Sequence, residues 1–451
     1  MDTTLRALNR FGLGARVGER RALGDAKQWL RAQVTGGPPL AEDIVQPDEI
    51  TEALTLLRSA QRARNEAQLK TAQRAIGSIR AREMEEMLRL RVASERPYLE
   101  RLVAFWSNHL CVSLTASRQV VALAGHYERT AVRPHVLGRF EDMVLASAQH
   151  PAMLMYLNNL VSIGPRSQAG RRTARRDRPR GLNENYAREL LELHTVGVNG
   201  GYTQADVEQL ARVLTGWTVA GIGPLARPDD LVGFSFNPLL HEPGEKVVLG
   251  TRYEEAGVAE GVELIRDLCA HPSTATFVAT KLVTHFVADD PPEAAIARVA
   301  QVFRDTRGDL REVSLALIDL DEAWAPEHVK FRSPQDWVVA LFRSFGSREA
   351  PAVVGGVLNQ LRHTPWAPAA PKGYGDTRRE WADPDALMNR AEFAQTVSAR
   401  VARDGRFDPS VLLDVVDVAD DDPIRGFLAD GTISNQERLA LAFGGPAFQW
   451  R

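Results

Sequence analysis

Apolar residues recur every three or four positions along most of the chain, which is the spacing of one face of an α-helix. A core helix is expected to start at Pro97, whose ring suits a first helical turn, and to reach Leu110. The same spacing predicts helices over residues 118–130, 137–149, 151–158, 254–269, 272–287, 293–305 and 310–318. The predicted fold class is therefore all-α, a predominantly helical, multi-helix globular fold.

One stretch departs from this helical spacing. GFSFNPLLHEPGEKVVLG at residues 233–250 holds two short β-rich runs on either side of a Pro-Gly turn. These runs predict one small β-hairpin near residues 234–249. No repeat of fixed period occurs in the sequence, which argues against a solenoid.

The N-terminal part of the chain carries a different pattern. Residues 50–94 are rich in Arg, Glu, Ala and Leu, with alternating charges and a thin apolar stripe, and predict a long helical arm or hairpin with an interruption at Gly77. A chain of 451 residues can form two or three domains. We instead expect one compact unit, in which an N-terminal segment with this arm (1–95) precedes a main helical domain (96–451) with a basic loop at 166–180.

Polar and ionisable residues are densest in GLNENYARELLELHTVGVNGGYTQADVEQLARVLTGWT at residues 181–218. Asn183 is a good N-cap for a helix that starts at Glu184, and Gly197 is expected to end that helix. Thr203 and Asp206 have the spacing of a capping box. A second helix is therefore predicted over residues 204–214.

The first of these helices separates its side chains onto two faces. His194 falls on the apolar side with the leucines, and the other side carries Glu184, Asn185, Arg188, Glu189 and Glu192. In a regular helix Glu192 and His194 are roughly 160° apart, so they could bind one metal ion only if the helix unwinds near Thr195. The alternative is structural, because Arg188 stands four residues from both Glu184 and Glu192 and can form a solvated ladder of ion pairs.

Other histidines differ in how readily local structure explains them. His241 lies in the turn HEPGEK, where with Lys246 it could orient an anionic or carbonyl group or act as a general acid or base, although the turn itself is an alternative explanation. His150 and His271 each precede a proline and are interpreted as helix boundaries. His285 follows Lys281 by one turn and is interpreted as a helix-packing residue.

Taken together, these residues suggest one composite pocket between helices. The candidate catalytic residues are Glu189, Glu192, His194, His109 and His241. The candidate substrate-binding residues are Asn108, Arg133, His135, Asn185, Arg188, Trp217 and Lys246. Carboxylates and imidazoles from several helices suit iron, manganese or zinc, so a divalent metal is a candidate cofactor, although the spacing alone does not specify one.

Net charge, cysteine content and missing motifs exclude several classes of function. A formal net charge of −3 gives no reason to expect nucleic-acid binding. Only Cys111 and Cys269 occur, far apart, which excludes a disulfide framework and a zinc knuckle, and no G-x-S-x-G, H-E-x-x-H or P-loop pattern is present. No leader-like or long apolar stretch occurs, so we expect a cytoplasmic protein without membrane insertion.

The basic loop at 166–180 holds seven arginines against one aspartate and almost no apolar residue. We expect it to be exposed and poorly ordered. It ends shortly before Asn183, so it could form an electropositive lid over the start of that helix, or it could be a solvated insertion without a function.

Several motifs carry a resemblance to a known family: WSNH at 106–109, RPHVLGRF at 133–140, HPAMLMYLNN at 150–159, LTGW at 214–217 and HEPGEKVVLG at 241–250. Together they closely resemble the bacterial domain-of-unknown-function family 1800 over nearly the whole chain. The resemblance implies no established reaction. Tyr374 in PKGYGD departs from the Gly-Trp-Pro turn usual in that family.

The resemblance also implies a partner and a second compartment. Genes of this family often accompany family 1501 proteins, which look like sulfatase-type hydrolases, and relatives often look exported. Two hypotheses therefore stand: an enzyme with a carboxylate/histidine pocket between helices, which may use a metal ion, or a non-catalytic partner of a family 1501 protein. In the second case the chain could reach the periplasm by export together with that partner.

Overall fold

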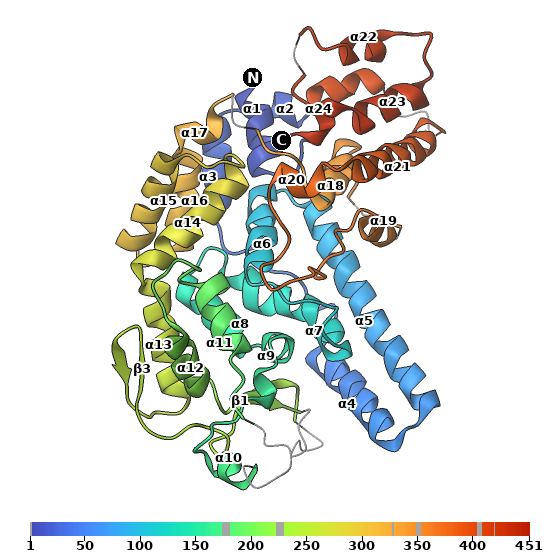
Figure 1. Cartoon of the computed structure of the whole chain (residues 1–451). Helices are drawn as coiled ribbons and strands as arrows, with labels where there is room; N and C mark the ends of the chain where they lie inside the picture. Colours follow the sequence, from blue (N-terminus) through green and yellow to red (C-terminus); the bar gives the residue numbers. More distant parts are fainter. Residues whose placement is uncertain are drawn as a thin grey trace.

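The computed structural model describes residues 2–173, 181–221, 230–326, 329–348, 353–403, 408–418 and 420–451. Helices dominate these residues, and the strands form only two small two-stranded sheets (Figure 1). The prediction of a predominantly helical, multi-helix fold is confirmed. The first residues form α1 (Thr3–Arg6), a π-helical turn (Ala7–Phe11), α2 (Glu19–Ala22) and α3 (Ala26–Thr35).

The core is built around α6 (Pro97–His109), which lies in the middle of the molecule in Figure 1. Pro97 occupies its first turn, as predicted, and Tyr98 is fully buried. The Tyr98 ring packs edge-on against Phe11 of the N-terminal segment and Phe286 at the end of α14 (Pro272–Phe286). The first residues of the chain therefore pack inside the main helical body.

The N-terminal arm is a helical hairpin of α4 (Pro47–Ala63) and α5 (Glu66–Ala93), which extends from the body in Figure 1. Arg64 between them has a left-handed backbone (φ 50°), and the Asn65 side chain accepts a hydrogen bond from the Gln68 N–H to start α5. The chain therefore turns at Arg64 and Asn65. The predicted interruption at Gly77 is wrong, because α5 continues through this position.

Most of the predicted helices form close to their expected bounds. The matching elements are α7 (Arg118–Tyr127), α8 (Phe140–Gln149), α9 (Pro151–Tyr156), α13 (Val258–Ala270), α14, α15 (Glu293–Asp305) and α16 (Leu310–Asp319). A π-helical turn (Glu128–Val132) extends α7, and short 3-10 helices cover Arg133–His135 and Asn159–Val161. His150 and His271 are helix boundaries as interpreted, since each Nδ1 accepts a hydrogen bond from the backbone two residues later.

The polar signature folds into two helices joined by a turn. Asn183 Oδ1 accepts from the Asn185 N–H, which starts α11 (Asn185–Glu189), and the helix then widens into a π-helical turn (Leu190–His194). The capping box of Thr203 and Asp206 is present at the start of α12 (Gln204–Val213). Local sequence therefore accounts for the starts of both helices, although α11 begins at Asn185, one residue later than predicted.

The strands pair differently from the prediction. β2 (Gly233–Phe236) pairs antiparallel with β1 (Trp217–Ala220), and β3 (Lys246–Val248) pairs antiparallel with β4 (Thr251–Tyr253). The two β-rich runs of the predicted hairpin thus belong to separate sheets. β2 pairs with the more distant β1, which local pattern cannot specify, whereas β3 and β4 form a tight hairpin through Leu249 and Gly250, both with positive φ.

The basic stretch is only partly the loop that was expected. Its beginning forms α10 (Gln168–Thr173), and Ser167 just before this helix is 2% exposed. The expectation of a loop is wrong for residues 168–173, which are helical, whereas the expected exposure holds for Arg166, Gln168, Arg171 and Arg172. Glu242 binds Arg166 just before this helix. Residues 174–180, on which the rest of the lid hypothesis depends, lie outside the described residues.

The C-terminal part packs against α6 and α5. It comprises α17 (Asp321–Trp324), α18 (Pro334–Ser344), α19 (Val354–Gln360), α20 (Arg378–Trp381), α21 (Pro384–Arg403), a 3-10 helix (Pro409–Asp414), α22 (Ile424–Ala429), α23 (Asn435–Gly444) and α24 (Pro446–Gln449). The irregular segment 362–377 runs between α19 and α20 and returns to the end of α6, where the Leu114 N–H donates to the Trp366 carbonyl.

Candidate functional site

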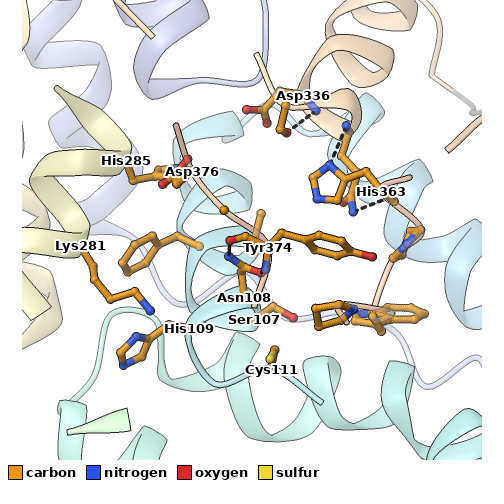
Figure 2. A pocket seen from close by; sticks show the side chains of 18 of the residues that line it. Ser107, Asn108, His109, Cys111, Lys281, His285, Asp336, His363, Tyr374 and Asp376 are labelled. Atoms are coloured by element: carbon orange, nitrogen blue, oxygen red, sulfur yellow. Dashed lines mark hydrogen bonds and ion pairs between the residues drawn. The ribbon is translucent and has the colours of Figure 1, made fainter. Parts of the chain in front are cut away.

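A cavity of about 310 Å³ lies between α6, α14, the start of α18 and the segment 362–377 (Figure 2). This volume suits a small molecule. Its polar lining comes from these elements, from α5 and from the π-helical turn that follows α7, and includes Arg91, Ser107, Asn108, His109, Cys111, Glu128, Lys281, Thr284, His285, Asp336, His363, Lys372, Tyr374 and Asp376. Residues far apart in the sequence thus surround one small space.

His285 and Asp376 form a hydrogen-bonded pair in this cavity, with 2.6 Å between Nδ1 and Oδ2 (Figure 2). Burial lowers the pKa of His285 despite the nearby Asp376 carboxylate, so the ring is neutral near pH 7. Burial opposes ionisation of Asp376, but His285, Lys330 and Arg451 outweigh it and lower the pKa of Asp376 to about 2. A charged carboxylate only accepts, so Nδ1 carries the proton, and the buried Nε2 keeps a lone pair with no protein partner.

His109 presents a second free imidazole nitrogen. Its Nε2 donates to the carbonyl of His194 at 3.1 Å, and Nδ1 is buried without a hydrogen-bond partner. Burial, together with the nearby Lys281 ammonium, lowers the pKa of His109 well below its usual range. The ring is therefore neutral, with its lone pair on Nδ1.

Lys281 stands one helical turn before His285 on α14, and Figure 2 shows its amino group pointing toward His109. The described residues give this amino group neither a hydrogen bond nor an ion pair; its nearest recorded contact is the Phe277 ring, 5.6 Å away. Burial lowers the pKa of Lys281 to about 8. It is thus an unpaired cation that loses its proton more readily than an exposed lysine.

The other carboxylates of the cavity are already engaged by the protein. Asp336 binds Arg101 at 3.1 Å and Arg451 at 3.4 Å. Glu128 accepts from Ser107 at 2.8 Å and from the Trp366 ring N–H at 2.9 Å. Lys281 and Lys372, by contrast, have no ion-pair partner among the described residues, so their two positive charges exceed the one negative charge of Asp376, whose side chain is bonded to the neutral His285 ring.

Asn108 fixes the position of the segment 362–377. Its side chain makes two hydrogen bonds with the backbone of Tyr374, accepting at 2.8 Å and donating at 2.9 Å. Gly373 approaches so closely that a Cβ there would lie 2.4 Å from the Asn108 carbonyl oxygen. Asn108, a candidate for substrate binding, therefore holds the wall of the cavity, and Tyr374 packs with its ring against His363.

A second polar cluster surrounds His241, away from this cavity. The Lys246 ammonium donates to His241 Nε2 at 3.3 Å and pairs with Glu260 at 2.8 Å, while His241 Nδ1 donates to the Thr215 carbonyl at 2.8 Å. All of these side chains are buried, and Trp217 packs against Gly261 beside them. His241 borders a shallow cleft with Arg166 and Arg171, separate from the cavity of His109.

The remaining candidates have structural partners. Arg133 is buried against Glu100 at 2.7 Å, and His135 lies half-buried outside the cavity. Arg188 pairs with Glu184 and Glu192 in the predicted ladder. Glu189 is partly exposed, and burial, followed by the Glu192 charge, raises its pKa. Asn185 is exposed. His194 is buried among the apolar residues, as its helix face predicted.

The prediction that His109, Glu189, Glu192 and His241 surround one pocket is wrong. Of these four only His109 lines the cavity, because the π-helical turn keeps Glu192 on the solvent side and β3 holds His241 in its own cluster. Within the described residues, no three His, Cys, Asp or Glu side chains are placed to hold a metal ion. No helix in these parts of the chain has the length and apolar character needed to cross a membrane.

Sequence reasoning missed Lys281, His285 and Asp376. His285 does pack between helices, against Phe105 of α6, and its bond to Asp376 adds a polar contact that the interpretation did not include. The spacing Lys281-x-x-x-His285 places two ionisable groups on one helix face, which is a signal that could have identified both. Asp376 lies far from α14 in the sequence, so no local pattern could link it to Lys281 and His285.

A family model described as "Protein of unknown function (DUF1800)" matches residues 6–450, nearly the whole chain. No curated protein and no solved structure matches the chain.

Proposed function

Since this chain belongs to the DUF1800 family, whose description specifies no activity, we propose its function from the cavity: an enzyme that binds a small anionic molecule between α6, α14 and segment 362–377 and moves a proton with His285. The proposal keeps the idea of a carboxylate/histidine pocket between helices. It moves that pocket to the His285–Asp376 pair.

The observation that carries the proposal is the free Nε2 of His285. Asp376 holds the ring in the tautomer whose Nε2 accepts a proton, and its charge stabilises the imidazolium that then forms. Burial keeps the ring neutral beforehand, so it is ready to act as a base. A histidine that only filled space would need no orienting carboxylate.

The charge of the lining supports an anionic ligand. Lys281 and Lys372 lack ion-pair partners among the described residues, whereas Asp336 and Glu128 are neutralised by neighbouring arginines. An anion inside the cavity would provide the missing partner for Lys281. A carboxylate or phosphate group on a small molecule fits this requirement.

Two other features favour this reading over the remaining hypotheses. The polar motif residues His109, Arg133, Trp217, His241 and Lys246 are buried, which supports an internal role over a docking surface for a family 1501 partner. The proposal assigns no step to a metal ion, because the described residues offer no three-ligand group for one.

Ligand binding gives the first test. Small carboxylates and phosphates are screened by thermal shift against the wild type, Lys281→Met and the control Lys70→Met, whose lysine is exposed on α5. We expect ligands that raise the melting temperature of the wild type and the control but not of Lys281→Met. The absence of any such ligand would count against the anion site.

Turnover gives the second test. Ligands that bind are incubated with the protein and followed by proton NMR. His285→Asn should retain binding and lose conversion by about a hundredfold or more, since general-base groups contribute about that much. Conversion at the wild-type rate by His285→Asn would overturn the assigned role.

A further inference from the structure

Lys281 differs from the other lysines in a way that anion binding does not explain. The chain has six lysines, all within the described residues. Lys246 and Lys330 are buried but paired with Glu260 and Asp289, while Lys70 and Lys372 are exposed. Lys27 lies over the Trp324 ring at the surface. Lys281 and Lys372 both line the cavity without an ion-pair partner among the described residues, but Lys372 is exposed, whereas Lys281 is half-buried.

The surroundings of Lys281 offer proton acceptors as well as room for an anion. His109 and His285 both line the cavity, and each has one buried ring nitrogen with a lone pair and no hydrogen-bond partner. A site that only bound an anion would need no such proton acceptors. Two neutral bases beside an amine instead provide acceptors and carriers for the protons of a reaction at nitrogen.

We propose that Lys281 is a nucleophile that forms an imine with the carbonyl carbon of a small aldehyde or ketone carrying an anionic group. This inference rests on the proposed function and specifies the substrate class of the same cavity. Lysines placed in desolvated, uncompensated surroundings are those that carry out this chemistry.

The reaction can be followed atom by atom. The neutral Lys281 nitrogen forms a bond to the carbonyl carbon, and the π electrons of the carbonyl move to its oxygen. His109 Nδ1 accepts the proton that the nitrogen releases and passes it to the oxygen. A second proton, taken from solvent, lets this oxygen leave as water while the nitrogen lone pair forms the C=N bond. The net change is amine plus carbonyl plus one proton to iminium plus water.

Protonation at neutral pH is compatible with this step. With the pKa of Lys281 near 8, about a tenth of the amine is neutral at pH 7, far more than for an exposed lysine of ordinary pKa. His109, toward which the amine points, and His285 on the same helix are neutral, Asp376 is bonded to His285, and Cys111 stays a thiol because burial raises its pKa to about 12.

Reductive trapping tests the proposal on the full-length protein. Glyoxylate, an aldehyde that carries a carboxylate, is added at pH 7 with sodium cyanoborohydride, and modified lysines are quantified by peptide mass spectrometry. Lys281 should become carboxymethyllysine at least about ten times faster than Lys70, because a larger fraction of its amine is neutral. Labelling of Lys281 no faster than Lys70 would overturn the proposal.

Variants separate this proposal from the proposed function. His109→Asn should slow labelling of Lys281 by about tenfold while the labelling of Lys70 stays unchanged, since a proton acceptor has been removed. Binding of propionate, which has no carbonyl, is measured in parallel by thermal shift. Propionate binding that depends on Lys281 without any trapping would overturn the imine and retain the anion site. If propionate does not bind and Lys281 is not labelled, the imine proposal and the anion site are both wrong.

Discussion

Asp376 and His285 share a hydrogen bond in which the carboxylate can only accept, and this single contact decides which ring nitrogen is free. At the scale of individual residues the cavity therefore depends on one carboxylate contributed by an irregular segment. The same bond links the ionisation of Asp376 to the stability of the fold, because its pKa of about 2 lies below the ordinary 3.8.

Asp376→Asn is expected to lower the free energy of unfolding by about 2 kcal/mol at pH 7. A carboxylate with a lowered folded pKa contributes its stability above pH 3.8 and loses it as the pH falls toward 2. The difference between wild type and variant should therefore shrink at pH 3. Urea unfolding at both pH values provides the measurement, and an equal difference at pH 7 and pH 3 would contradict the linkage.

At the scale of elements, the segment 362–377 is positioned by its contacts with α6. Asn108 holds the Tyr374 backbone, and Gly373 lies against the Asn108 carbonyl with a left-handed backbone (φ 80°). Asp376 follows three residues later, so a shift of this turn changes the distance from Asp376 to His285. Gly346 also has positive φ (67°), but a Cβ there would meet nothing within 4 Å.

Gly373→Ala should therefore cost more than Gly346→Ala. Both variants lose about 1 kcal/mol from the left-handed backbone. Gly373→Ala should lose at least about 1 kcal/mol more from overpacking against Asn108, and it should also weaken ligand binding in the cavity. Denaturant unfolding and thermal-shift titration of both variants are the measurements. Equal losses in the two variants would show that the close approach does not matter.

At the scale of the whole molecule, residues from both ends of the described chain meet behind the cavity. Arg451 donates to the carbonyls of Arg10 and His285 at 3.1 and 3.2 Å, and its guanidinium lies 3.4 Å from Asp336. The backbones of Lys330 and Arg451 are also hydrogen-bonded to each other. Arg451 thus connects the N-terminal segment, α14 and α18.

Arg451→Met is expected to lower the free energy of unfolding by about 3 kcal/mol, because it leaves buried carbonyls without donors and weakens the compensation of Asp336. Arg74→Met, at an exposed position on α5, is the control and should change it by less than about 0.5 kcal/mol. Calorimetry of both variants measures the difference. A small effect at Arg451 would mean that the two ends of the fold are coupled by other contacts.

Local pattern in the sequence was enough to predict the helical class, most helix positions and several caps, because helix periodicity and capping act between residues a few positions apart. The Thr203 capping box and the His150 and His271 boundaries formed as expected. The tertiary structure decided that β2 pairs with β1 and which polar groups meet. His285 and Asp376 are 91 residues apart, and only the packing of segment 362–377 onto α6 brings them together. Polar residues that are dense in sequence, such as Glu192 and His241, were instead separated by helix geometry and by the pairing of β3.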